Sequence, residues 1–153
     1  MTDFIEVRGG LASHFVEYMT EGRKNGYEVE HIWADWADHW ERHKDEFTHK
    51  ADFDEYRNRL GALLILPKTF NASYGDLTYT KKLPNYLKQN LLAQSLNPSA
   101  YDHNPPLKKV IQAGLPFVSH EQFRKADVET RQNLYVEIAT HVWNPDRLDE
   151  AAS

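Results

Sequence analysis

The sequence predicts a mostly helical α+β fold, and three observations support this prediction. Apolar residues recur at helical spacing in four stretches: 11–20, 33–47, 79–96 and 128–142. A short stretch of alternating polarity at 27–32 is typical of a strand. A nearly continuous apolar run at 60–66 is typical of a buried strand. We therefore expect helices packed around one small hairpin.

Each element of the first half follows from a local pattern. One apolar stripe indicates the helix at 11–20, and two glycines within 21–26 end it. Alternating side chains indicate the strand at 27–32. The helix at 33–47 carries a second stripe, formed by Trp33, Trp36, Ala37, Trp40 and Phe47.

The second half is read in the same way. Pro67 stops the apolar run and so ends the second strand. Residues 70–75 resemble a loop, and Pro84 is expected in the first turn of the helix at 79–96. Loops are predicted at 97–106 and 113–120, and Asn144-Pro145 ends the last helix.

Composition limits the class of protein. A length of 153 residues fits one domain over 1–153, and 41% hydrophobic residues argue against disorder. The absence of cysteine excludes disulfides, thiolate catalysis and Cys-based zinc sites. No apolar run reaches about 18 residues, so no membrane span is expected. The N-terminus lacks signal-peptide features, so we expect a cytoplasmic protein or a piece excised from a longer one.

The charge is distributed unevenly. The chain carries a net charge of −5, which argues mildly against a general nucleic-acid binder. Residues 57–88 nevertheless have a net charge of +5, because Asp76 is the only acid among six basic residues: Arg57, Arg59, Lys68, Lys81, Lys82 and Lys88. Such a local cationic patch can bind a few phosphates.

The pair Glu30-His31 and the later Asn71 are the candidates for chemistry. A carboxylate and a histidine where a strand runs out can hold a metal and activate water. Adjacent strand residues point to opposite faces, so the pair shares a site only if the strand ends or bends there. Otherwise, Glu30 faces solvent, His31 packs at an edge, and Asn71 makes a turn. Without cysteine, oxygen and imidazole ligands favour Mg²⁺ or Mn²⁺.

Three segments carry a family resemblance: YEVEHIWAD at 27–35, RNRLGALLILPKTFNASYGDL at 57–77, and Lys81-Lys82. They resemble the C-terminal domain of GmrSD-type modification-dependent restriction endonucleases, and phosphorothioate-sensing SspE-type defence proteins carry a similar domain. The resemblance covers about 27–92, and the tail fits less specifically. The family pattern is matched at Glu30, His31, Ile32, Gly61, Leu63, Ile65, Leu66 and Asn71. The chain departs from it at Ala62, where the family usually has the middle Asn of its H-N-H triad.

The resemblance implies a ββα-metal, HNH-like hairpin-plus-helix core at about 27–92, with a helical part at about 107–143. It assigns His31 as the general base and Glu30 and Asn71 as ligands of one Mg²⁺ or Mn²⁺ ion. Ala62 leaves three alternatives for holding the base. Asn58 takes over the catalytic support, the hold is made by the backbone alone, or catalysis is weakened.

The basic residues are candidate nucleic-acid contacts. Lys82 could act as a point charge at the transition state, and the other candidates are Arg57, Arg59, Lys68, Lys81 and Lys88. Arg57 and Arg59 alternate along a predicted strand and should face the same side. The simpler interpretation is that the lysines are solvated.

A second possible metal site is less favoured. His39 and His43 have the i, i+4 spacing that can chelate zinc on a helix. The segment is dense in mixed charge, and His39 is not followed directly by the Glu of zinc peptidases. A solvated helix face is therefore the preferred interpretation.

The function expected from the resemblance is a divalent-metal-dependent DNA endonuclease that nicks, the effector of a bacterial antiviral defence protein in the cytoplasm. The resembling proteins have an N-terminal nucleotide-hydrolysing sensor domain. This chain lacks a Walker A motif, so no nucleotide cofactor is expected here. A homodimer would allow double-strand cleavage. The alternative is a catalytically decayed module that binds DNA or a partner without cutting.

Overall fold

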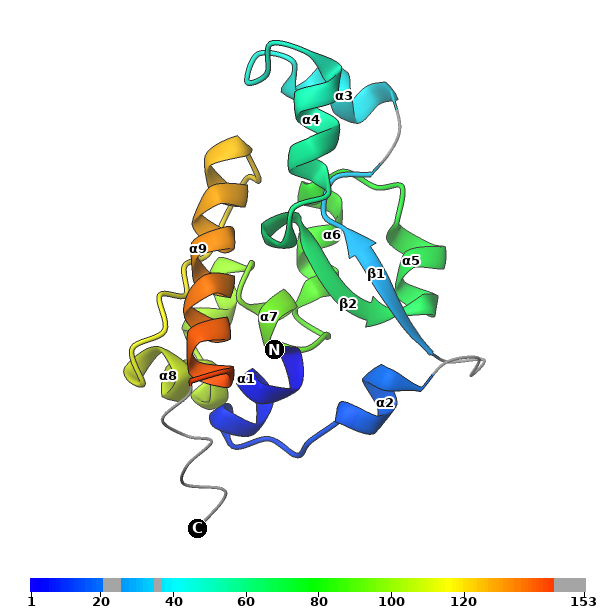
Figure 1. The fold of residues 1–153 in the computed structure, drawn as a ribbon. Coiled ribbons are helices and arrows are strands. Elements are labelled where there is room, and N and C mark those ends of the chain that lie inside the picture. The colour runs from blue at the N-terminus through cyan, green and yellow to red at the C-terminus, as the bar shows by residue number, and fades with distance from the viewer. Residues whose placement is uncertain (21–25, 35–36, 145–153) are drawn as a thin grey trace.

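A computed structural model describes residues 1–20, 26–34 and 37–144 (Figure 1). The first half contains α1 (Thr2–Gly9), α2 (Phe15–Met19), β1 (Tyr27–His31), α3 (Ala37–His43), α4 (Lys50–Arg57), the 3₁₀ helix η1 (Leu60–Ala62) and β2 (Leu63–Pro67). The second half contains α5 (Lys68–Tyr74), α6 (Tyr79–Tyr86), α7 (Leu91–Gln94), the 3₁₀ helix η2 (Pro98–Tyr101), α8 (Pro105–Gln112) and α9 (Lys125–Val142). The predicted mostly helical α+β fold is confirmed.

The two strands pair antiparallel, and the register decides which side chains are buried. His31 lies opposite Leu63, and Glu30 lies opposite Leu64. Directly opposed residues share a face of the sheet, so Glu30 shares the buried face with Leu64. Helix α5 follows β2 directly and contacts both strands (Figure 1).

Side chains cap both outer edges of this sheet. On β2, Tyr135 donates its hydroxyl to the Leu63 carbonyl at 3.0 Å. The Asn90 amide donates to the Ile65 carbonyl at 2.7 Å. On β1, Asn71 donates to the Val29 carbonyl at 3.2 Å, and the Lys82 ammonium donates to the His31 carbonyl at 2.9 Å. These strand carbonyls therefore have partners without a third strand.

Helix α9 crosses η1 at very close range, as Figure 1 shows beside β2. A Cβ atom on Gly61 would lie 2.2 Å from the Val128 carbonyl oxygen and 2.8 Å from the Gln132 backbone nitrogen. Only glycine fits this approach. The apolar core extends from there to an aromatic cluster in which Trp33 stacks on Phe53 with ring centroids 5.3 Å apart.

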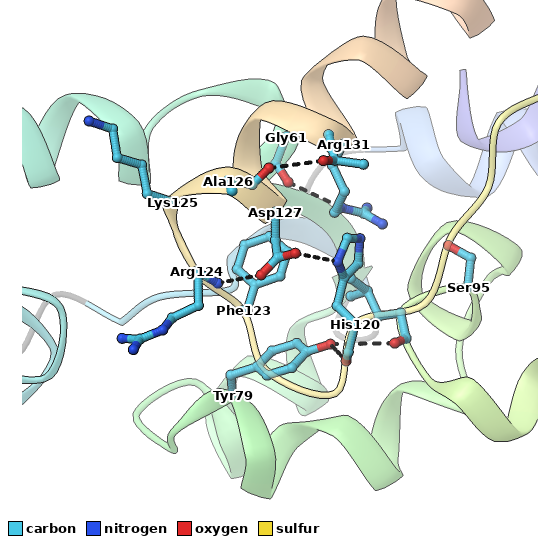
Figure 2. Close-up of polar contacts among 12 residues, drawn as sticks. Gly61, Tyr79, Ser95, His120, Phe123, Arg124, Lys125, Ala126, Asp127 and Arg131 are labelled. Atoms are coloured by element: carbon cyan, nitrogen blue, oxygen red, sulfur yellow. Dashed lines mark hydrogen bonds and ion pairs between the residues drawn. The ribbon is translucent and has the colours of Figure 1, made fainter. Parts of the chain in front are cut away.

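A polar cluster fixes the start of α9 (Figure 2). The Asp127 carboxylate accepts the Arg124 backbone N–H at 2.7 Å and lies 2.8 Å from Nδ1 of His120. The Tyr79 hydroxyl donates to the His120 carbonyl at 2.5 Å. We call His120, Asp127, Arg124 and Tyr79 the α9 cap cluster.

The helix predicted at 11–20 is only partly correct. Helix α2 covers Phe15–Met19, and its residues contribute nothing to the buried core. Phe15 and Met19 are 58% and 66% exposed, so the apolar stripe faces outward. Helix α1 was not predicted. It places Ile5 in the core and packs against α7 and α8.

Three predicted elements in the middle of the chain have different bounds. The helix predicted at 33–47 is shorter, because α3 covers Ala37–His43 and α4 begins at Lys50. The predicted loop at 70–75 is largely helix α5. The helix predicted at 79–96 divides into α6 and α7, with Pro84 inside α6 rather than in its first turn.

The C-terminal part is helical, as predicted. Within the expected loop at 97–106, η2 forms and α8 begins, and α9 starts at Lys125, three residues earlier than expected. Across the described ranges, none of the helices combines the length and apolar character needed to cross a membrane.

Candidate functional site

An open pocket of about 260 Å³ lies where β1 ends. We call it the β1 pocket, and its lining residues are Val29, Glu30, His31, Ala34, Arg57, Asn71, Gly75 and Asp76. The structure thus brings Glu30 and His31 from β1 and Asn71 from α5 to one pocket. The strand ends at His31, which allows two adjacent residues to reach one pocket.

Glu30 forms a buried ion pair with Lys82. The Lys82 ammonium lies 2.6 Å from Oε1 of Glu30, and the Tyr86 hydroxyl lies 3.3 Å from the same oxygen. Glu30 is 2% exposed and Lys82 is 0% exposed. Glu30 is therefore not the solvent-facing strand residue of the simpler interpretation.

Burial opposes the charges of this pair. Loss of solvent raises the pKa of Glu30 against the attraction of Lys82. The same loss lowers the pKa of Lys82, although Glu30 favours its charged form. The short contact compensates for part of the cost of burying both groups.

His31 is supported by Asn58. Nε2 of the half-buried His31 lies 3.2 Å from Oδ1 of Asn58. The Asn58 amide nitrogen donates to the Asp54 carbonyl at 2.7 Å, which fixes the amide orientation. Because Oδ1 can only accept, this contact favours the tautomer with the proton on Nε2 and the basic lone pair on Nδ1.

Ala62 is fully buried, and its carbonyl accepts the Ile32 N–H at 3.0 Å. These contacts bear on the sequence alternatives for holding the base, because a hold by the backbone alone would leave the His31 ring without a side-chain contact. Asn58 contacts the ring, and a backbone bond holds the residue after it.

Asn71 contributes an acceptor with unmet hydrogen-bonding capacity. Its amide nitrogen is used on the Val29 carbonyl, while its buried Oδ1 has no hydrogen-bond partner. Buried acceptors normally have partners, so such an atom facing a pocket is a candidate ligand atom. Asn71 lies in the first turn of α5 and not in the predicted loop.

Arg57 and Asp76 complete the lining. The Arg57 Nε atom donates to the Trp33 carbonyl at 2.9 Å. Asp76 is an exposed carboxylate that sequence reasoning did not assign to the site. Its only signal in the sequence was its isolation among six basic residues at 57–88.

The predicted basic contacts differ in accessibility. Lys68, Lys81 and Lys88 are exposed, as a phosphate contact requires. Lys82 is fully buried, so the expectation that it meets a phosphate as an exposed point charge does not fit. Arg59 is paired with Glu55 at 2.5 Å and lies over the Tyr56 ring.

The predicted strand for Arg57 and Arg59 is wrong. Arg57 ends α4, and Arg59 precedes η1. The two side chains therefore do not share a strand face.

The expected solvated face at His39 and His43 is also wrong. His39 is 3% exposed, and burial lowers its pKa. The His43 ring stacks on Phe53 with centroids 5.9 Å apart, and its Nδ1 lies 2.9 Å from Glu46. His39 is therefore buried and His43 is half-buried against the aromatic cluster, and neither lies on a solvated helix face.

The β1 pocket contains oxygen donors of the kind that hard cations prefer. No group of three or more His, Cys, Asp or Glu suited to a metal occurs among the residues that the structure describes. The pocket instead supplies the Glu30 carboxylate, the unsatisfied Oδ1 of Asn71 and the Asp76 carboxylate. Mg²⁺ is commonly bound through one or two carboxylates while it keeps several waters.

Comparison with known protein families identifies a family for this chain. The family model described as "GmrSD restriction endonucleases, C-terminal domain" matches residues 8–138, which include every residue of the β1 pocket. Neither a curated protein nor a solved structure matched the chain.

Proposed function

The chain belongs to the family of C-terminal domains of GmrSD restriction endonucleases, and from this membership we propose that it is an HNH-like, divalent-metal-dependent DNA endonuclease. One observation carries the proposal. Glu30, His31 and Asn71 line a single open pocket, and Asn71 presents a buried acceptor there without a partner.

The hairpin and α5 would form the ββα-metal core. Strand β1 provides Glu30 and His31, β2 pairs with it, and α5 provides Asn71. Two strands followed by a helix thus surround the candidate chemistry. This arrangement supports the HNH-like assignment.

His31 would act as the general base. With Nε2 directed at Asn58, the lone pair on Nδ1 would accept the proton of the attacking water. Asn58 would keep the ring in this tautomer and stabilise the protonated ring that forms. Its role is therefore to orient the base and not to exchange protons.

Glu30 and Asn71 would hold one Mg²⁺ or Mn²⁺ ion. When bound, such an ion supplies positive charge to the phosphate and to the departing oxygen. Lys82 would act through Glu30, because its ammonium is buried against that carboxylate. Arg57 would bind a phosphate oxygen through its terminal nitrogens while Nε stays on Trp33.

The exposed Lys68, Lys81 and Lys88 lie outside the lining of the β1 pocket and would bind DNA phosphates farther along the duplex, with little sequence preference. Modified phage DNA, including phosphorothioate DNA, is the proposed target of the full-length bacterial protein in the cytoplasm. An N-terminal sensor domain would select that DNA. One site per chain implies nicking, and a homodimer would cut both strands.

Metal-dependent plasmid nicking tests the proposal. Nicking should require Mg²⁺ or Mn²⁺ and stop in EDTA, and Asn71→Ala should raise the Mg²⁺ concentration needed for half-maximal rate. Asn133→Ala on the exposed side of α9 is the matched control and should leave the Mg²⁺ requirement unchanged. Full activity in EDTA would contradict the proposal.

One observation favours the decayed-module alternative. Glu30 is 2% exposed and already paired with Lys82, which is also what a purely structural ion pair would show. A decayed module would shift the mobility of DNA without nicking it at any Mg²⁺ or Mn²⁺ concentration. The same plasmid assay therefore separates the two functions.

A further inference from the structure

We infer that α9 is a positioning element for His31, acting through Arg131, Gln132 and Tyr135. The catalytic part of this inference rests on the proposed nuclease function. None of the three side chains lines the β1 pocket. Their contacts instead converge on residues 61–63, the segment paired with the end of β1.

The three side chains bind the backbone of this segment. Oε1 of Gln132 accepts the Gly61 N–H at 3.0 Å. Nε of Arg131 donates to the Gly61 carbonyl at 3.1 Å (Figure 2). The Tyr135 hydroxyl donates to the Leu63 carbonyl at 3.0 Å. We call this set of contacts the α9 clamp.

A single backbone hydrogen bond connects the clamped segment to the residue that follows His31. The Ala62 carbonyl lies between the clamped groups and accepts the Ile32 N–H at 3.0 Å. Ile32 directly follows His31, and Leu63 is the residue opposite His31 in the sheet. The clamp therefore fixes the backbone from which the His31 ring reaches Asn58.

Arg131 shows that this contact is more than packing. The side chain is buried, its Nε and Nη1 donate to the carbonyls of Gly61 and Leu92, and its Nη2 has no hydrogen-bond partner among the described residues. A buried guanidinium is costly unless it is hydrogen-bonded. Here it is directed at the peptide just before Ala62, the position that lacks the Asn side chain of the family pattern. The α9 clamp therefore supports the backbone beside Ala62, whose own side chain cannot make hydrogen bonds.

The test uses Gln132→Met, which removes the acceptor for the Gly61 N–H, and Gln132→Glu, which keeps an acceptor there. Ile138→Val is the matched control, because Ile138 is buried on the same helix and belongs to the core rather than to the clamp. The readouts are the ¹⁵N shifts of the His31 ring, the melting temperature, and kcat and KM for plasmid nicking.

We expect Gln132→Met to reduce the share of the Nε2–H tautomer of His31 and to lower kcat about 10-fold with little change in KM. Gln132→Glu should keep both the tautomer share and kcat near those of the parent protein. Ile138→Val should lower the melting temperature while leaving the tautomer and kcat unchanged. Tyr135→Phe, which preserves the ring, provides a second variant if Gln132→Met fails to fold.

Wild-type His31 shifts in both Gln132→Met and Tyr135→Phe would overturn the inference. The ring measurement needs no DNA cleavage, so it also separates this inference from the proposed function. If the parent protein does not nick at all, the nuclease proposal fails, while the tautomer measurement still decides whether α9 positions His31.

Discussion

The β1 pocket and the α9 cap cluster each contain a histidine with an oxygen partner, and they differ in access. His120 has the stronger partner, since its Nδ1 lies 2.8 Å from the Asp127 carboxylate. Its side chain is only 4% exposed, and the ring meets Phe123 edge-on. His31 has a neutral partner at 3.2 Å but lines an open pocket. Access to water and substrate, rather than the strength of the pair, distinguishes the candidate site from the structural one.

The polar groups around the two histidines also differ. Around His31 lie a second carboxylate, Asp76, and the unsatisfied oxygen of Asn71. Around His120, the Tyr79 hydroxyl and the Arg124 backbone are used for capping and packing (Figure 2). The first environment suits a cation and a phosphate, whereas the second joins α9 to α6.

The largest expected effect comes from replacing each of the two histidines, His31 and His120, by alanine. His31→Ala should lower the nicking rate by about 10²–10⁴-fold and leave the melting temperature near that of the parent, because a general base contributes this much. His120→Ala should do the opposite, lowering the melting temperature while the folded protein still nicks. Initial rates of plasmid nicking and thermal melts measure both. His103→Ala, at an exposed histidine, should change neither. Parental nicking by His31→Ala would exclude His31 as the base.

The next effect concerns stability beneath the pocket. Lys82→Met should reduce the free energy of unfolding by about 3–5 kcal/mol, since it leaves the buried Glu30 without its partner. Arg124→Met removes an exposed ion pair near the α9 cap cluster and should cost no more than about 1 kcal/mol. Urea unfolding compares them. Adding Glu30→Gln to Lys82→Met should recover stability without recovering nicking. A Lys82→Met protein as stable as the parent would contradict the role of this pair.

A smaller effect concerns the affinity for DNA and its salt dependence. Charge reversal at Lys68, Lys81 and Lys88 should weaken binding equally across sequences and flatten its salt dependence by about 0.9 in log–log slope for each lost phosphate contact. Lys82 is left out, because it is buried. The control reverses Lys108 and Lys109 on α8, which packs against α1. Titrations at several salt concentrations measure the slope, and an equal loss per reversed charge in both sets would argue against a DNA path over Lys68, Lys81 and Lys88.

The smallest expected effect is a pH dependence at the α9 cap cluster. Burial raises the pKa of Asp127, but His120 and the Arg124 N–H outweigh it and hold the pKa below its ordinary value of 3.8. The contribution of Asp127 is therefore complete above pH 3.8 and is lost as the pH falls through the lower folded pKa. Asp127→Asn should cost about 0.3–1 kcal/mol at neutral pH and show a flatter acid limb in denaturant titrations. An unchanged acid limb would show that the carboxylate charge contributes nothing.

The hairpin was predictable from the sequence because its signals are local. Alternation marked β1, and the apolar run ending at Pro67 marked β2, so Glu30 and His31 could be placed where the strand ends. The placement of Asn71 beside them was predictable only from the resemblance. The local sequence favoured a loop, yet the chain enters α5 directly after Pro67.

The buried polar residues were not predictable, because their partners are distant in sequence. Lys82 follows another lysine and therefore resembles a solvated residue, but it meets Glu30 across 52 positions. His39 and His43 lie among charged residues, yet His39 is buried and the His43 ring packs on Trp33 and Phe53. Tertiary contacts decide whether such polar residues are buried, and helical spacing in the sequence gives no information on those contacts.

The capping of the β1 edge has a consequence for solubility. Asn71 and Lys82 occupy the Val29 and His31 carbonyls, and Val29 is itself 47% exposed. Open strand edges recruit strands from other chains, and an apolar side chain beside the edge strengthens that tendency. Asn71→Ala should therefore promote self-association as well as weaken metal binding. One amide side chain would thus have two roles, one at the pocket through Oδ1 and one at the strand edge through its contact with the Val29 carbonyl.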